Sequence, residues 1–167
     1  MRKWWISFTA AVAAVSAAAV LSGAELAAAS ARPPKPAIEY FHSMTTSGTA
    51  NQISEIATGV FTAGGVDITR SATTDIFKFP VGTIYITHHS VHHTIAFNRR
   101  TCLFTGTDYG TYKLTGGTGE YAGISGSGKA VSHVIGVAAR DAKGRCSLTR
   151  APVAFQFVTS GHGPVKL

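Results

Sequence analysis

From Ala37 to the C-terminus, several short runs, such as residues 129–137, alternate apolar and polar residues with a period of two, and no segment shows a convincing 3.6-residue apolar period over the length of a helix. Thr, Val, Ile, Phe and Tyr dominate this region, and glycine-rich breaks recur at short intervals. The pattern predicts an all-β domain with strands at residues 37–46, 54–63, 74–79, 83–89, 92–97, 101–105, 109–115, 128–137 and 151–159.

Several of these strands carry their bulky apolar residues on one face, as Phe77 and Phe79 do. Eight or nine such strands either close into a barrel or stack as a sandwich. We expect a single antiparallel β-barrel of about eight strands over residues 37–167, with a β-sandwich as the alternative. A barrel of about eight strands has an interior just wide enough for side chains or one small ligand.

One hairpin can be placed in register within residues 83–97. If Ser90 and Val91 form a two-residue turn, His88 opposes His93 on the face that also holds the bulky aliphatic residues. This register predicts two neighbouring imidazoles that face the barrel interior.

The first 31 residues have the composition of a secretory signal peptide. Arg2 and Lys3 precede an almost wholly apolar run, and Ala29-Ser30-Ala31 supplies the small residues that a signal peptidase requires. We therefore expect a secreted, extracellular protein with no membrane span after cleavage. Its predicted parts are a signal peptide at 1–31, an extended linker at 32–36 and the β-barrel domain at 37–167.

Cys102 and Cys146 are the only cysteines, and both follow the predicted cleavage site. In an oxidising compartment a disulfide between them is the default. A redox-active pair is usually spaced more closely, as C-x-x-C. The spacing therefore predicts a structural disulfide.

The chain is basic, with 15 Lys and Arg against 8 Asp and Glu and a net charge of +7 at pH 7. Such an excess can mark an acidic partner. The basic residues after the signal peptide are scattered, however, and Arg99-Arg100 is the only adjacent pair and has no aromatic ladder beside it. We expect no nucleic acid partner, and the sequence leaves the oligomeric state open.

Two overlapping glycine-rich segments fit nucleotide-binding patterns, residues 117–122 as G-x-G-x-x-A and residues 123–129 as a phosphate loop short of its last position. Both motifs need a helix that begins at the final glycine. Residues 129–137 instead alternate with period two and are rich in β-branched side chains, and Ala130 stands where Ser or Thr must bind Mg²⁺. The segment predicts tight turns between strands.

Residues 116–119 read Gly-Gly-Thr-Gly and are followed by Tyr121 and Gly126. This block resembles the G-G-T-G-x-aromatic block of the dirigent and allene oxide cyclase-like barrels. The wider run from 101 to 128 is similar to that of small secreted bacterial proteins with the same fold and no settled activity. The resemblance implies an eight-stranded antiparallel barrel. It implies no chemistry, because the acidic and arginine pocket residues of the plant family have no counterpart that we can place.

The histidines are the one concentration of reactive side chains, with four of them between positions 88 and 93. Opposed histidines on adjacent strands can share a metal, but a good site needs a third or fourth ligand, and no spacing supplies one. We therefore expect no metal and no cofactor. His133 shares a strand face with Ile135 and Val137, so it is a further candidate to point inward.

Catalytic arrangements have little support in the sequence. Ser125 and Ser127 lie in a glycine run that lacks the closing glycine and the helix of a nucleophile elbow. Acidic residues are few, and Asp108 and Glu120 border glycine turns, where such residues are most often solvated or bonded to local amides.

We expect a secreted barrel without catalysis that holds a small apolar ligand, with Tyr85, His88, His93 and His133 as the candidate binding residues. A cyclase-like or isomerase-like enzyme in the same interior is the first alternative. A structural or cell-surface interaction protein with a solid core is the second. Interior volume separates the solid core from the other two, and a buried ionisable group with a partner in the cavity would favour the enzyme.

Overall fold

The computed structural model describes residues 36–167, which form strands and no helix. Residues 1–35, with the predicted signal peptide and nearly all of the predicted linker, lie outside the described residues. The strands are β1 Ile38–Thr45, β2 Gln52–Thr58, β3 Ala63–Ser71, β4 Thr74–Phe79, β5 Gly82–Asn98, β6 Leu103–Gly119, β7 Ser125–Val137 and β8 Ala154–Lys166. Within the described residues there is accordingly no helix long and apolar enough to cross a membrane.

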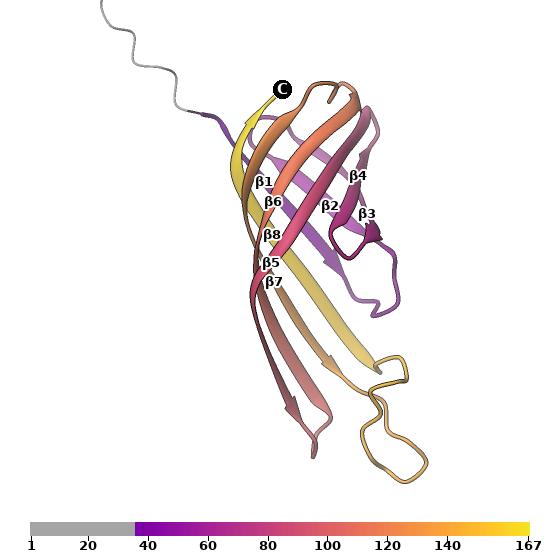
Figure 1. Cartoon of the computed structure of the whole chain (residues 1–167). Helices are drawn as coiled ribbons and strands as arrows, with labels where there is room; N and C mark the ends of the chain where they lie inside the picture. Colours follow the sequence, from indigo (N-terminus) through magenta and orange to yellow (C-terminus); the bar gives the residue numbers. More distant parts are fainter. Residues whose placement is uncertain (1–35) are drawn as a thin grey trace, which may run out of the picture. The chain divides into compact units, whose positions relative to one another are not determined.

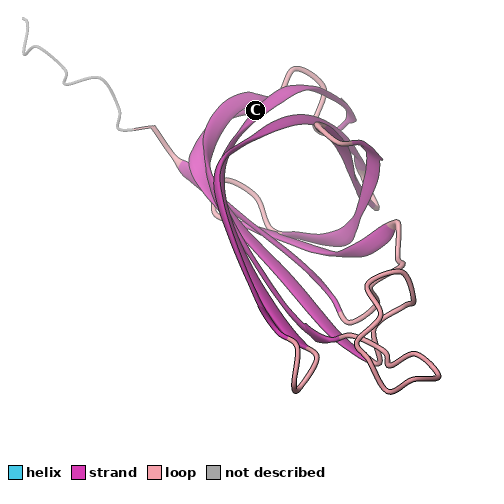
Figure 2. Cartoon of the chain, turned by 60° about the horizontal axis from the view of Figure 1, so that its bottom comes forward, coloured by secondary structure: helices cyan, strands magenta, loops and turns pink. Residues whose placement is uncertain are grey.

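Each strand pairs antiparallel with the next, and β8 pairs with β1, so the sheet closes into a barrel (Figure 1). The predicted antiparallel barrel of about eight strands is confirmed, and the sandwich alternative is excluded. Figure 2 shows the closed ring together with the longer strands that continue beyond it.

The predicted hairpin around Ser90 and Val91 is wrong. Both residues lie inside β5, which pairs with β6 from Gly82 to Asn98 and passes Ser90 with a register shift. A two-residue hairpin turn needs residues that adopt positive φ easily, and Ser-Val does not. The chain reverses instead after Asn98, whose side-chain oxygen accepts hydrogen bonds from the backbone N–H groups of Arg100 and Thr101.

Strand β3 has no counterpart among the predicted strands. It begins with Ala63, Gly64 and Gly65, which have little strand preference. A Cβ at Gly65 would lie 2.7 Å from Cδ1 of Phe79, so this strand approaches β4 too closely for a side chain there. Packing against β4, rather than local propensity, therefore places β3 in the barrel.

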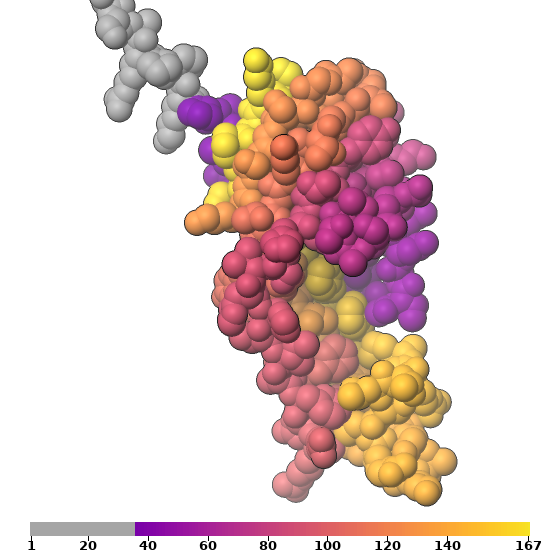
Figure 3. All heavy atoms as spheres, viewed as in Figure 1, coloured from indigo at the N-terminus to yellow at the C-terminus, as the bar shows by residue number. Residues whose placement is uncertain are grey.

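The second half of the chain projects beyond the first half. The pairing of β4 with β5 ends at Thr87, and the pairing of β1 with β8 ends at Phe157, whereas β5 to β8 continue beside one another (Figures 1 and 3). At the end of this projection, Cys102 and Cys146 form the predicted disulfide, with 5.4 Å between their Cα atoms. The disulfide joins the β5–β6 turn to the loop before β8, and its loop closure is worth about 4 kcal/mol in the chain-entropy model.

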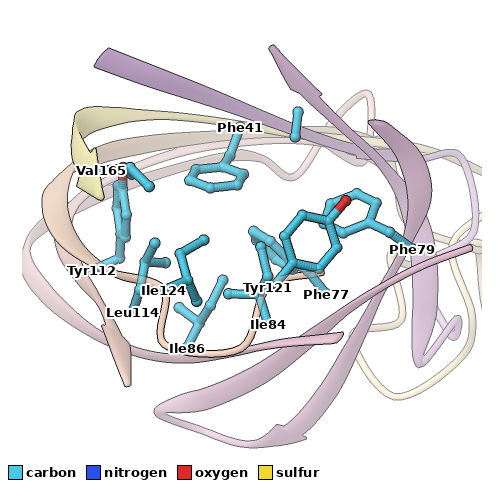
Figure 4. Close-up of a cluster of buried hydrophobic side chains, with 11 residues drawn as sticks. Phe41, Phe77, Phe79, Ile84, Ile86, Tyr112, Leu114, Tyr121, Ile124 and Val165 are labelled. Carbon is cyan, nitrogen blue, oxygen red and sulfur yellow. The ribbon is translucent and has the colours of Figure 1, made fainter. Parts of the chain in front are cut away.

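Aromatic side chains fill one part of the barrel interior (Figure 4). Tyr121 and Ile124 belong to the turn between β6 and β7, yet both are buried. The ring of Tyr121 lies 4.9 Å from that of Phe61 and 5.5 Å from that of Phe79, measured between centroids. The turn therefore contributes to the hydrophobic core as well as connecting two strands.

The predicted tight turn lies at residues 120–124, a shorter stretch than the glycine-rich segment, whose two ends belong to β6 and β7. Gly119 and Gly123 have φ values of 61° and 86°, a backbone conformation that suits glycine. Since β7 begins at Ser125, no helix N-terminus is available there to hold a phosphate group.

We predict that Gly117→Val destabilises the fold by about 2 kcal/mol or more, because overpacking at a close backbone approach is costly. A Cβ at Gly117 would lie 2.8 Å from the carbonyl oxygen of Thr83. The exposed Lys129 provides the control, since Lys129→Ala should change the unfolding free energy by less than about 0.5 kcal/mol. Urea denaturation followed by circular dichroism measures both, and equal stabilities would contradict the prediction.

Candidate ligand site in the barrel interior

Beside the hydrophobic core, the barrel interior contains a cavity of about 360 Å³. This volume falls within the range of small-molecule pockets, which begins near 300 Å³. Exposed residues such as Ser71 and Ser90 are among those that line it, so the cavity reaches the surface. Its apolar wall is formed by Phe41, Phe77, Ile86, Tyr112, Ala130 and Phe157.

A row of polar side chains crosses the inner surface of the first five strands. We call Ser43, Glu55, Asp67, Asp75 and His88 the acidic row; they come from β1 to β5 in that order. The Ser43 hydroxyl donates a hydrogen bond to Glu55 Oε2 and lies 3.4 Å from Asp67 Oδ2. At the other end of the row, His88 Nε2 lies 3.1 Å from Asp75 Oδ2.

The strand period explains why these polar groups face inward. Glu55 lies two residues before the buried Ala57, and Asp75 lies two residues before the buried Phe77. Residues two apart on a strand share a face, so closure of the barrel places the carboxyl groups inside with their apolar neighbours. Glu55 is only 1% exposed and Asp67 only 7%.

Burial changes the protonation of the acidic row. The pKa of Glu55 is raised to about 8 and that of Asp67 to about 7, and desolvation by burial is the main cause in both cases. Nearby carboxyl groups raise both pKa values further, whereas the hydrogen bonds from Ser43 lower them. Desolvation also raises the pKa of Asp75, against the lowering effect of His88. Glu55 and Asp67 therefore exchange protons near neutral pH.

The acidic row, and Tyr112 on the cavity wall beside it, hold buried polar atoms that lack a hydrogen-bond partner in the described part of the chain. Oδ1 of Asp67, Oδ1 of Asp75 and the hydroxyl of Tyr112 are buried and have no hydrogen-bond partner within residues 36–167. Every Lys and Arg in that range is exposed, and none lines the cavity. A buried polar atom without a partner costs about 1–3 kcal/mol, so these groups favour a ligand that can bond to them.

Glu39 is a further buried carboxyl group, but it has a structural role. Its Oε2 accepts hydrogen bonds from the backbone N–H groups of Val60, at 2.6 Å, and Phe61, at 3.1 Å. These bonds hold the connection between β2 and β3 against β1. Glu39 is fully buried and does not line the cavity.

Of the four residues that the sequence singled out, His88 lines the cavity. Tyr85 is 41% exposed and alternates with the buried Ile84 and Ile86, so it faces outward. His93 and His133 are exposed as well, and neither lines the cavity. The structure does not bring the four together. His88 and His93 belong to the same strand, β5, so they do not face each other across a hairpin.

Glu55, Asp67 and Asp75 are candidate site residues that the sequence did not single out. Their signal was the same alternation that identified Phe77 as one of a one-sided set, because counting back two positions from Phe77 reaches Asp75. Polar residues on an apolar strand face are therefore candidate site residues, as the histidines are.

Within residues 36–167, no group of three or more His, Cys, Asp or Glu side chains is arranged to hold a metal ion.

No protein-family model, curated protein or solved structure matches the chain. The fold and the site define the protein as a closed eight-stranded antiparallel barrel with a partly apolar, acid-lined cavity.

We predict that the protein is more stable at pH 5 than at pH 8.5. The pKa values of Glu55 and Asp67 are higher in the folded chain than their ordinary values of 4.5 and 3.8, so the folded state binds more protons between about pH 4 and pH 8. The unfolding free energy should therefore fall across that range, by on the order of a few kcal/mol. Thermal unfolding at a series of pH values measures this slope.

Glu55→Gln should flatten the pH slope and raise the melting temperature at pH 8.5, because the amide cannot ionise. Glu120→Gln is the matched control, since Glu120 is exposed in the β6–β7 turn. If the Glu55→Gln variant shows a pH slope as steep as that of the Glu120→Gln variant, the assigned burial of Glu55 is wrong.

Proposed function

We propose that the protein is a non-catalytic binding protein that holds a small molecule with a mostly apolar body in the barrel cavity. The observation that carries this proposal is the cavity of about 360 Å³, with its apolar wall and the acidic row beside it. Protein interiors are normally close-packed, and unfilled apolar space lowers stability. A cavity of this size therefore supports an occupant more than a structural role with a solid core.

The proposed setting is extracellular. The disulfide between Cys102 and Cys146 supports it, because such bonds persist in oxidising compartments. The composition of residues 1–31 supports export through a signal peptide. A relationship to the allene oxide cyclase-like and dirigent-like barrels is part of the same proposal; it rests on residues 116–126, and it requires the closed eight-stranded architecture.

The binding proposal predicts that a neutral apolar probe enters the cavity. N-phenyl-1-naphthylamine should gain fluorescence in the presence of the protein, because its rings leave water for an apolar wall. Ala130→Phe should weaken this binding at least about tenfold, since Ala130 on β7 lines the cavity. Ile135→Phe is the matched control, because Ile135 lies on the same strand and is 45% exposed. Equal effects of the two substitutions, or no binding, would contradict the proposal.

A second candidate function is proton transfer on the bound molecule, as in an isomerase-like or cyclase-like enzyme. The observation that favours it is Asp67, a cavity-lining carboxyl group whose pKa is raised to about 7, mainly by burial. A group with that pKa can serve as general base or general acid at neutral pH. The target would be a C–H bond next to a carbonyl group.

The enzyme alternative predicts that the protein accelerates hydrogen–deuterium exchange in 4-phenylbutan-2-one in D₂O, as followed by NMR. Asp67→Asn should abolish the acceleration, since the amide cannot take up the proton. Asp141→Asn is the control, because Asp141 lies in the loop before β8 and pairs with Arg145 at 2.9 Å. Binding of the ketone without faster exchange would favour the non-catalytic function.

A further inference from the structure

We propose that the cavity selects an organic cation, an amine whose ammonium group meets the acidic row and whose apolar body packs against the aromatic wall. This inference rests on the proposed binding function and specifies the chemical class of the ligand.

The first argument is the hydrogen-bonding state of Asp67 and Asp75. Asp67 is 7% exposed and lines the cavity, and its Oδ1 has no hydrogen-bond partner in the described residues. Asp75 also lines the cavity and has one such oxygen, while its other oxygen meets His88. An ionised carboxylate can only accept hydrogen bonds, and an ammonium group supplies three donors and no acceptor. The two chemistries are complementary.

The second argument is the distribution of charge. The chain carries a net charge of +7, yet every Lys and Arg of residues 36–167 is exposed, whereas Glu55 and Asp67 are buried inside the barrel. Buried charges are normally paired, and an unpaired one costs several kcal/mol. Apart from His88, which meets Asp75, no basic side chain of the acidic row offers a positive charge, and a cationic ligand would supply one beside Asp67. An anionic ligand would meet carboxyl groups of its own sign.

The third argument is the aromatic wall beside the acidic row. The ring centroid of Phe41 lies 5.3 Å from that of Phe77 and 5.7 Å from that of Tyr112, and all three residues line the cavity. Figure 4 shows their rings in one cluster of side chains. Aromatic faces attract a cation within about 6 Å of the ring centre, and they also pack against an apolar body. The same rings can therefore serve both parts of one amine.

Binding of a cation should be linked to loss of protons from the acidic row. Burial raises the pKa of Asp67 and Glu55, and an adjacent ammonium group favours their ionised forms, so protons are released as the cation binds. Affinity then rises with pH by up to about tenfold per pH unit for each proton released. The titratable groups that interact with Asp67 or line the cavity with it are Glu55 on β2, Asp75 on β4, His88 and His89 on β5, and Asp108 and Tyr112 on β6.

The test compares three probes that share one apolar body: 4-phenylbutylamine, 4-phenylbutan-1-ol and 4-phenylbutanoate. Isothermal titration calorimetry at pH 8 should show that the amine binds at least about tenfold more tightly than the alcohol, with the carboxylate weakest. The amine should bind about tenfold more weakly at pH 6 than at pH 8, and titrations in two buffers of different ionisation enthalpy should show proton release. The alcohol should show neither effect.

Asp67→Asn should remove the preference for the amine and keep the binding of the alcohol, while Asp141→Asn keeps both. If Asp67→Asn does not fold, as judged by circular dichroism, the proton release of the unaltered protein decides the matter. Alcohol binding that equals or exceeds amine binding would overturn the cation inference and leave the binding function standing. Amine binding without proton release or pH dependence would also overturn the cation inference and leave the binding function standing. Failure of all three probes and of N-phenyl-1-naphthylamine would overturn the binding function itself.

Discussion

The pairing of β1 with β8 is the constraint on which the rest of the structure depends. It runs from Ile38 to Thr45 and turns a sheet with two edges into a closed barrel. Closure removes the exposed edges of β1 and β8 along this length, and it directs every second residue of the strands within the closed ring toward the interior. The nature of the interior then follows from which residues occupy those positions.

Two kinds of inward-facing residues divide the barrel interior. Around Tyr121 the side chains are aromatic or aliphatic and pack densely, which supplies hydrophobic stabilisation. Around Asp67 the carboxyl groups replace apolar volume, and the interior remains hollow. Burial of these carboxyl groups costs stability at neutral and higher pH, because the folded state must then hold ionised groups away from water. The region therefore lowers stability, a cost that the proposed binding function would account for.

The errors at β5 and β3 have the same physical origin. In the sequence, Ser90 and Val91 separate two short apolar runs, and the two glycines at the start of β3 read as a break. In the structure, long-range pairing decides both segments, since β6 pairs along the whole of β5 and β4 accepts the close approach of Gly65. Local turn and strand preferences are worth about 1 kcal/mol or less per residue, so a continuous ladder of backbone hydrogen bonds overrides them.

The sequence by itself determined the period of the strands, the all-β class, the approximate strand number and the single cysteine pair, because these depend on local alternation and on residue count. It also placed His88 on the same face as Ile84 and Ile86, the face that lines the interior near the acidic row. Only the tertiary structure decided that Ser43, Glu55, Asp67 and Asp75 lie side by side. They are spread over 33 positions of the chain, from 43 to 75. The register of the strands in the closed barrel brings them together, and no local sequence pattern encodes that register.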